Sequence, residues 1–576
     1  MKYKITYKNP TSQYIPIEAE IACKGKTEIE ICLPAWRPGR YELGNFAKNI
    51  HGFSVYDDKG KKVVFEKTTK DSWLVKLNKT NFVNVKYNYF AADLNAGSTF
   101  MNDQQLYVNP VNCLVYVKDK LDEACELKLE LPESFELACG ASHKKDLIKT
   151  DSFHELADSP FIASASLQHN TYKAKGVLFH LWFQGETKLN WEKILKDFQK
   201  FTESQLEKFG VFPAKEYHFI FQVLPFPAYH GVEHRTSTVL ALGPGYDLMT
   251  EVYDDLLGVC SHELYHAWNV KTIRALDMFP YDYSKENYSR LGYVCEGVTT
   301  YMGDLFLAEA GVKDFVWYKK ELEKLLQKHF DNFGRFNYSV ADSSFDTWLD
   351  GYVPGVPNRK TSIYNEGSLL SLVTDIKIRK NTNNKASLHD VMTAMNQRFA
   401  LKKKGYTEAD YKKIVEEFAG EKLDSLFKNY FNGLHSFESI LVEAFEGIGL
   451  TIKMSINPNF ANALLGVKTL LVGDKTIVSQ ISPGSSADLG KIMVQDEIIA
   501  INGFKVNNNL EKWVEYFKDT QVEVTVMRAG RMLTLFCPHT NKSYFPIYTL
   551  VKAKAPSNLQ KKTFKKWCSC EWESIV

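Results

Sequence analysis

The sequence predicts a multidomain protein: a β domain, then a mixed α/β and α-helical domain, then a smaller α+β domain. At 576 residues the chain is long enough for several domains. Apolar residues alternate with a period of two up to about residue 170, follow a helical period after it, and change pattern again near 460. We therefore expect domains at 1–170, 171–455 and 460–540, with an extension at 541–576.

Strand patterns dominate the first domain. Residues 17–21, 28–32 and 125–131 alternate apolar and polar side chains, and turn residues separate such runs. The first eight residues also alternate like a strand and lack the apolar core of a signal peptide. As written, the chain is expected in the cytoplasm, although a leader could have been removed.

Helices are expected to dominate the second domain. Two segments of this domain, 217–224 and 237–242, have the composition of strands. Helical periodicity is found at 190–208, 251–270, 287–311, 314–330 and 364–380.

The third domain has the element order of a PDZ domain of the circularly permuted bacterial type, which it resembles. The pattern predicts strands at 477–481, 496–503, 521–528 and 531–537, and helices starting near 485 and at 509–518. The segment Leu464-Leu465-Gly466-Val467 is the candidate loop for a peptide C-terminus. The lysine-rich stretch 561–566 in the last 35 residues predicts a solvated extension.

Composition excludes several classes of protein. The 44% apolar and 24% charged content is typical of soluble globular proteins, and a net charge of +2 gives no reason to expect nucleic acid or an anionic membrane as partner. No apolar run approaches the ~18–20 residues of a membrane span. The ten cysteines are scattered rather than spaced as a disulfide scaffold, and Cys260 and Cys295 are expected to be buried, reduced thiols.

The most informative motif is His262-Glu263-Leu-Tyr-His266, followed thirty positions later by Glu296. Positions i and i+4 of a helix project from nearly the same face, so His262 and His266 can bind one ion. Two imidazoles and a later carboxylate form the three-ligand arrangement of catalytic zinc, which leaves a fourth position open. Taken alone, Glu296 is more simply a capping or salt-bridging residue; the two histidines make it the expected third ligand.

This pattern predicts hydrolysis with one Zn²⁺ per chain. Zinc polarises a carbonyl and lowers the pKa of its water towards ~7. Glu263 would take the proton from that water and deliver it to the leaving amine. Another divalent ion stays possible, although two imidazoles and one carboxylate favour zinc.

The segment His262–Lys271 together with Glu296-Gly-Val-Thr-Thr-Tyr301 resembles the glycyl aminopeptidase family. These gluzincin peptidases combine an N-terminal β domain, a thermolysin-like catalytic domain and a C-terminal PDZ domain. Trp36-Arg-Pro-Gly-Arg-Tyr41 is similar to a segment of the family's first domain, and Gly231-Val-Glu-His234 to its G-G-x-E-H segment. The resemblance spans about residues 1–540.

The resemblance implies two further site residues. Tyr364 matches the tyrosine that stabilises the oxyanion in related zinc aminopeptidases, although Glu366 replaces the usual lysine. Glu233 matches the acid that binds the substrate's α-ammonium, and Gly231 permits close approach of the backbone to substrate. Core or outer-shell roles are expected for His230 and His234.

The resulting hypothesis is a zinc aminopeptidase of peptides with a free N-terminus, and the preference for glycine or alanine rests on the resemblance alone. One alternative is a zinc endopeptidase that ignores the free amine. Another is a peptide-binding scaffold that acts through the PDZ domain.

Overall fold

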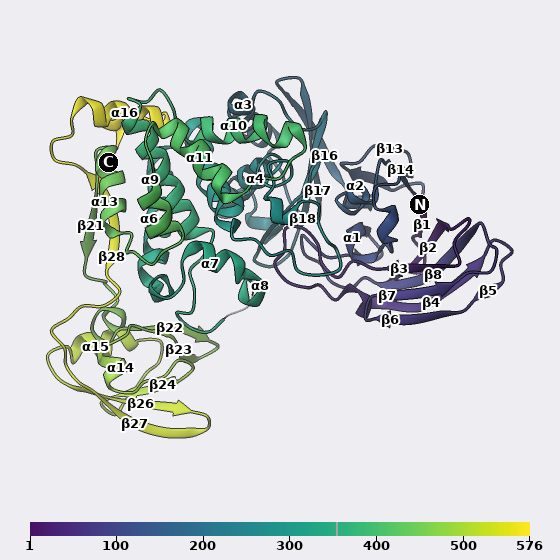
Figure 1. Ribbon diagram of the computed structural model, residues 1–576. Coiled ribbons are helices and arrows are strands. Elements are labelled where there is room, and N and C mark those ends of the chain that lie inside the picture. Colours follow the sequence, from purple (N-terminus) through teal and green to yellow (C-terminus); the bar gives the residue numbers. More distant parts are fainter. Residues whose placement is uncertain (353–354, 576) are drawn as a thin grey trace.

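The computed structural model describes residues 1–352 and 355–575 and has the predicted order of domains (Figure 1). An N-terminal β domain is followed by a central helical region and then by a separate β-rich domain, so the predicted fold class is confirmed. None of the helices in the described residues has an apolar stretch long enough to cross a membrane.

The N-terminal domain is built around an eight-stranded sheet. Buried and exposed side chains alternate along its strands because one face of the sheet packs on the core. In β2 (Tyr14–Ala22), for example, every second residue is buried. The sheet order is β13-β14-β11-β1-β2-β8-β4-β5. The other strands are β1 (Lys2–Thr6), β4 (Ile50–Asp57), β5 (Lys62–Val63), β8 (Phe82–Phe90), β11 (Cys125–Glu130), β13 (His143–Lys144) and β14 (Leu147–Thr150). A smaller sheet contains β3 (Glu28–Cys32), β7 (Ser72–Lys76) and β6 (Phe65–Thr69).

A four-stranded sheet joins this domain to the central region. Its order is β12 (Glu136–Cys139), β15 (Phe161–Ser164), β10 (Gln105–Val108) and β9 (Phe100–Met101). Apolar side chains of this sheet, such as Tyr107 and Ile162, share one buried cluster with Trp182 and Ile220 of the next sheet. The two domains are therefore held together by a common apolar core.

The central region begins with a five-stranded sheet in the order β16-β17-β18-β20-β19. Its strands are β16 (Gln168–Ala174), β17 (Val177–Gln184), β18 (Glu216–Val223), β20 (Ser237–Gly243) and β19 (Ala228–Glu233). Strand β19 is an edge strand, and the helices of this part are α3 (Trp191–Phe209) and α4 (Tyr253–His266). The expected helices at 190–208 and 251–270 correspond to these two.

Helices complete the region, as their periodicity predicts. They are the π-helix η6 (Tyr293–Val298), α5 (Thr299–Glu309), α6 (Phe315–Asp331), α7 (Val340–Phe345), α8 (Thr347–Asp350), α9 (Asn365–Asn381), α10 (Leu388–Arg398), α11 (Glu408–Ala419) and α13 (Glu438–Gly447). The helix expected from residue 287 begins only at Tyr293. The reason is that the Asn287 side chain forms a loop, accepting from the Asp282 N–H at 2.9 Å and donating to the Asp282 carbonyl at 2.8 Å.

The third domain has its own apolar core, which includes Val467, Val478, Ile498 and Val524. The sheet order is β22 (Val467–Val472), β23 (Lys475–Ile481), β24 (Glu497–Ile501), β26 (Val522–Arg528) and β27 (Arg531–Cys537). Helices α14 (Ser486–Leu489) and α15 (Leu510–Tyr516) cover it, close to the positions that the sequence predicts.

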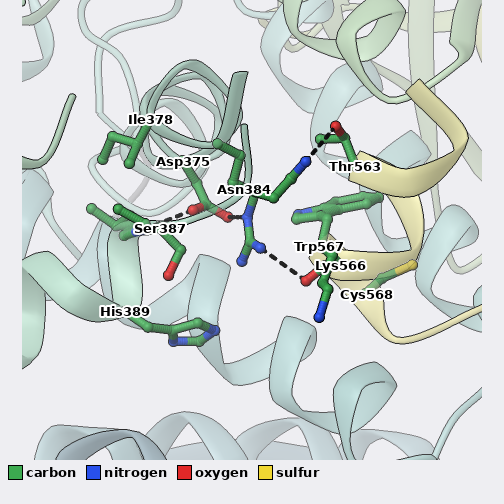
Figure 2. Close-up of polar contacts among 12 residues, drawn as sticks. Asp375, Ile378, Asn384, Ser387, His389, Thr563, Lys566, Trp567 and Cys568 are labelled. Atoms are coloured by element: carbon green, nitrogen blue, oxygen red, sulfur yellow. Dashed lines mark hydrogen bonds and ion pairs between the residues drawn. The ribbon is translucent and has the colours of Figure 1, made fainter. Parts of the chain in front are cut away.

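The prediction of a solvated C-terminal extension is wrong. Strand β28 (Ile547–Lys552) pairs with β21 (Leu450–Ser455), and α16 (Asn558–Cys568) packs on the catalytic helices (Figure 2). The helical period places the lysines of 561–566 towards solvent and Phe564 and Trp567 in the core. Asn384 donates to the Thr563 hydroxyl at 3.0 Å, one of the contacts that hold α16 (Figure 2).

Candidate active site

Helices α4 and η6 bring the three expected metal ligands together, a group called here the α4–η6 centre. The Nε2 atoms of His262 and His266 lie 3.0 Å apart. The Oε2 atom of Glu296 is 3.7 Å from Nε2 of His262 and 3.3 Å from Nε2 of His266. Each side chain thus turns one ligand atom towards a common point.

Asn269 orients this centre from behind. Nδ1 of His266 lies 2.6 Å from the Asn269 carbonyl oxygen, which can only accept, so Nδ1 carries a proton and Nε2 is the nitrogen left for a metal. The Asn269 side chain donates to the carbonyls of Val294 and Cys295 at 2.8 and 3.2 Å. One residue therefore fixes both a histidine ligand and the π-helix that carries Glu296, and π-turns are frequent at functional sites.

The charges of the centre fit a cation. Burial opposes protonation of His266, but the Glu296 carboxylate raises its pKa to about 10. The same histidine keeps the pKa of Glu296 well below its ordinary value despite burial. Burial raises the pKa of neighbouring Glu263 to about 8. Two imidazoles and one carboxylate are the donor set of catalytic zinc.

Strand β19 packs against α4, beside the α4–η6 centre. Alternate residues of a strand share one face, so Gly231 and Glu233 point the same way. A Cβ atom at Gly231 would lie 2.2 Å from Oε1 of Glu263, which means that only glycine leaves room for this carboxylate. Glu233 is buried at the end of the strand.

Tyr364 stands at the start of α9, close to the metal ligands. The backbones of η6 and α9 are in direct contact at two glycines. A Cβ atom at Gly297 would lie only 2.4 Å from the Cα of Gly367. Burial and then the Glu296 charge raise the pKa of Tyr364 well above its ordinary value, so its hydroxyl remains a donor. Glu366, which replaces the usual lysine, accepts from the Ser362 N–H at 2.9 Å and lies 3.2 Å from His329.

An aspartate of the N-terminal domain connects two of the motifs. Asp158 lies 3.0 Å from Nδ1 of His234 and 2.7 Å from Nζ of Lys271. Burial opposes its ionisation, but Lys271 and His234 keep the pKa of Asp158 well below its ordinary value. His234 is thus bound to a carboxylate, and His230 is half-buried on β19, its pKa lowered to about 4 mainly by burial.

A second possible set of ligands, called here the β17–β18 group, consists of His180, Glu216 and His218. Among residues 1–352 and 355–575, only this group and the α4–η6 centre place three such side chains within 4.8 Å. The indole N–H of Trp182 donates to Nδ1 of His218 at 3.1 Å. Because burial keeps His218 neutral by lowering its pKa well below 6.5, its proton is on Nε2 and no lone pair is free.

Comparison with known protein families identifies three parts of the chain. Residues 2–165 match the peptidase M61 N-terminal domain, 255–370 match the M61 glycyl aminopeptidase domain, and 443–527 match the PDZ domain. The chain thus contains the N-terminal and the catalytic domain of the M61 glycyl aminopeptidases. It is a zinc metallopeptidase, as the sequence predicts.

One solved structure shows the same fold as this chain over nearly its whole length. A crystal structure of an aminopeptidase N family protein from Idiomarina loihiensis has a TM-score of 0.90 at 24% identity, covering 98% of this chain and 99% of that one. An M1 zinc metallopeptidase from Deinococcus radiodurans has a TM-score of 0.48 at 12% identity, covering 76% of this chain and 94% of that one. No curated protein sequence gave a significant match.

The structure does not show the loop expected at Leu464–Val467. Leu464 and Leu465 belong to a short π-helix (Ala461–Leu465) and Val467 begins strand β22, so only Gly466 lies between these elements. Gly466 has φ +72° there, a conformation that favours glycine. Leu465 and Val467 are buried, whereas Leu464 is half-buried.

Sequence reasoning missed Asp158, Asn269 and the part that Trp36–Tyr41 plays in the site. The Tyr41 hydroxyl donates to Oε1 of Glu296 at 3.2 Å. The segment stood out as a family motif of the first domain, but no spacing along the chain could place it beside a residue 255 positions later.

Proposed function

We propose that this zinc peptidase is an aminopeptidase that removes small N-terminal residues, glycine or alanine, from peptides. The observation that carries the proposal is the position of β19 beside the α4–η6 centre. Gly231 of this strand lies against Glu263, and Glu233 follows two residues later. It offers an anion for a free amine next to a base and a metal.

In this proposal His262, His266 and Glu296 hold one zinc ion per chain. The ion would act as Lewis acid on the scissile carbonyl and on the attacking water. The carbonyl oxygen of Asn269 keeps His266 in the tautomer that leaves Nε2 available.

Glu263 is the proposed proton carrier. Its Oε2 atom is buried and makes no hydrogen bond in the described residues, so it is free to take a proton from the attacking water. Burial raises the pKa of this carboxyl to about 8, which suits a group that then returns the proton to the leaving amine. The Tyr364 hydroxyl would donate to the oxyanion, and removing such a donor typically costs about 10²–10³ in rate.

Glu233 is the proposed anchor for the α-ammonium group of the substrate. It lies two residues from Gly231 on β19, about 7 Å along a strand, a separation comparable to one substrate residue and its flanking atoms. The free edge of β19 can also pair with an extended peptide. The aromatic rings of Tyr41, Tyr352 and Trp348 pack together, and the Tyr41 hydroxyl contacts Glu296. In this proposal these rings would restrict the first residue of the substrate to a small one.

A peptide with and without an N-terminal acetyl group tests the proposal. We expect release of the first residue only from the free peptide, loss of release with a chelator, and recovery when zinc is added back. Equal cleavage of both peptides at internal bonds would instead support the endopeptidase alternative and remove the anchoring role of Glu233. Binding of a peptide C-terminus at 464–467 would be an additional property of the PDZ domain.

A further inference from the structure

The segment Trp36–Tyr41 belongs to the N-terminal domain by sequence, yet it is fixed to the catalytic region. Just before it, the Ala35 N–H donates to the Tyr283 carbonyl at 2.8 Å. The Trp36 ring packs on Tyr281 and Trp348, with centroids 5.4 and 5.5 Å apart. The segment is therefore held on the catalytic side rather than left as a free loop.

Tyr41 contacts the metal ligand Glu296 through the oxygen that does not face the histidines. Its hydroxyl donates to Oε1 at 3.2 Å, whereas Oε2 faces His266 at 3.3 Å. The Tyr41 ring stacks on Tyr352, and the Tyr41 N–H donates to the Tyr352 hydroxyl at 3.3 Å. A carboxylate with one oxygen fixed in this way presents the other in a defined direction.

Gly39 lies against the Glu233 carboxylate. A Cβ atom at this position would be 2.5 Å from Oε2 and 2.8 Å from Oε1 of Glu233. Gly39 also has φ +79°, so both space and conformation require glycine. The backbone of the segment thus forms a wall directly beyond the proposed amine anchor.

We propose that the Trp36–Tyr41 segment is part of the active site: Tyr41 positions the ligand Glu296, and Gly39 closes the cleft behind Glu233. This inference rests on the proposed function for the roles of metal and anchor. It explains why an additional residue or acetyl group ahead of the amine would be excluded, because the Gly39 backbone occupies that space. The N-terminal domain would then be required for both metal binding and substrate selection.

The positioning role of Tyr41 is tested by zinc affinity. In the full-length chain, competition with a chelator should show about 10–100-fold weaker zinc binding for Tyr41→Phe, with an unchanged melting temperature of the metal-free protein. The control is Tyr7→Phe, which removes a hydrogen bond to the Asn102 carbonyl in the same domain. Wild-type affinity in Tyr41→Phe overturns the role. If that variant does not fold, Tyr352→Phe, which removes the acceptor of the Tyr41 N–H, gives the same measurement.

The wall is tested by Gly39→Ala, whose new methyl group should displace the Glu233 carboxylate. We expect kcat/KM for a free-amine peptide to fall about tenfold or more, mainly through KM, because a charged contact is lost. Gly25→Ala is the matched control, since Gly25 has φ +82° and open space around it. Unchanged kinetics in Gly39→Ala would overturn the wall. A wild-type enzyme that ignores acetylation would instead refute the proposed function itself.

Discussion

The α4–η6 centre and the β17–β18 group each place two histidines and one glutamate within 4.8 Å. They differ in the hydrogen-bond partner of one histidine Nδ1 atom, which is an acceptor in the first group and a donor in the second. In the first, Nδ1 of His266 faces a carbonyl oxygen, which leaves Nε2 free to bind a metal. In the second, Nδ1 of His218 accepts from Trp182, which leaves a proton on Nε2. The glutamates also differ, since the Glu296 side chain is 6% exposed and the Glu216 side chain is 57% exposed. The comparison teaches that the hydrogen-bond partner of one ring nitrogen determines whether the other nitrogen is available to a metal.

The largest expected effect separates the two groups directly. His266→Ala should lose both bound zinc and peptidase activity, whereas His218→Ala should keep both. Metal content by elemental analysis and release of the N-terminal residue are the measurements, with melting temperatures to show that each variant folds. Zinc lost equally from both variants would mean that the β17–β18 group also contributes ligands.

The next effect concerns the chemistry at the α4–η6 centre. Glu263→Gln should keep zinc but lower turnover about 10²–10⁴-fold, because a general base that moves the proton typically contributes that much. Rates and metal content are measured on the same preparation. Wild-type turnover in this variant would remove Glu263 as the base.

The smallest expected effect is a gain at the β17–β18 group. Trp182→Phe removes the indole donor, so Nδ1 of His218 can carry the proton and Nε2 can bind metal. A zinc titration should then show a second site, about 10–100-fold weaker than a site with oriented ligands. If no second site appears, the hydrogen bond from Trp182 is not what prevents binding there.

Local patterns predicted much of the fold and few of the long-range contacts. The helical period predicted the ends of α3, α6 and α9 within one or two residues. This is possible because the apolar residues that one helix face buries repeat within a short stretch of sequence. The prediction failed for α16, because it relied on the lysine content of residues 561–566 and not on the helical spacing of apolar residues such as Trp567, which is buried.

The candidate site divides in the same way. The His262–His266 spacing is a property of one helix, so the sequence alone predicts that both can face one ion. Asp158 and Tyr41 lie at the site only because the two domains pack together. A single aspartate or tyrosine in the sequence does not indicate which residue of another domain it will contact. Tyr364 and Glu233 became candidates only through resemblance to related peptidases.

The pairing of β21 with β28 means that the PDZ domain leaves and re-enters the catalytic region at neighbouring points. A domain attached through two adjacent strands cannot swing like one at the end of a single linker. Its orientation is further restrained by Gln480, which donates to the Asp331 carbonyl, and by the ion pair of Lys468 with Asp331. The PDZ domain therefore keeps one orientation relative to the peptidase domain, because it is attached at both of its ends and along one side.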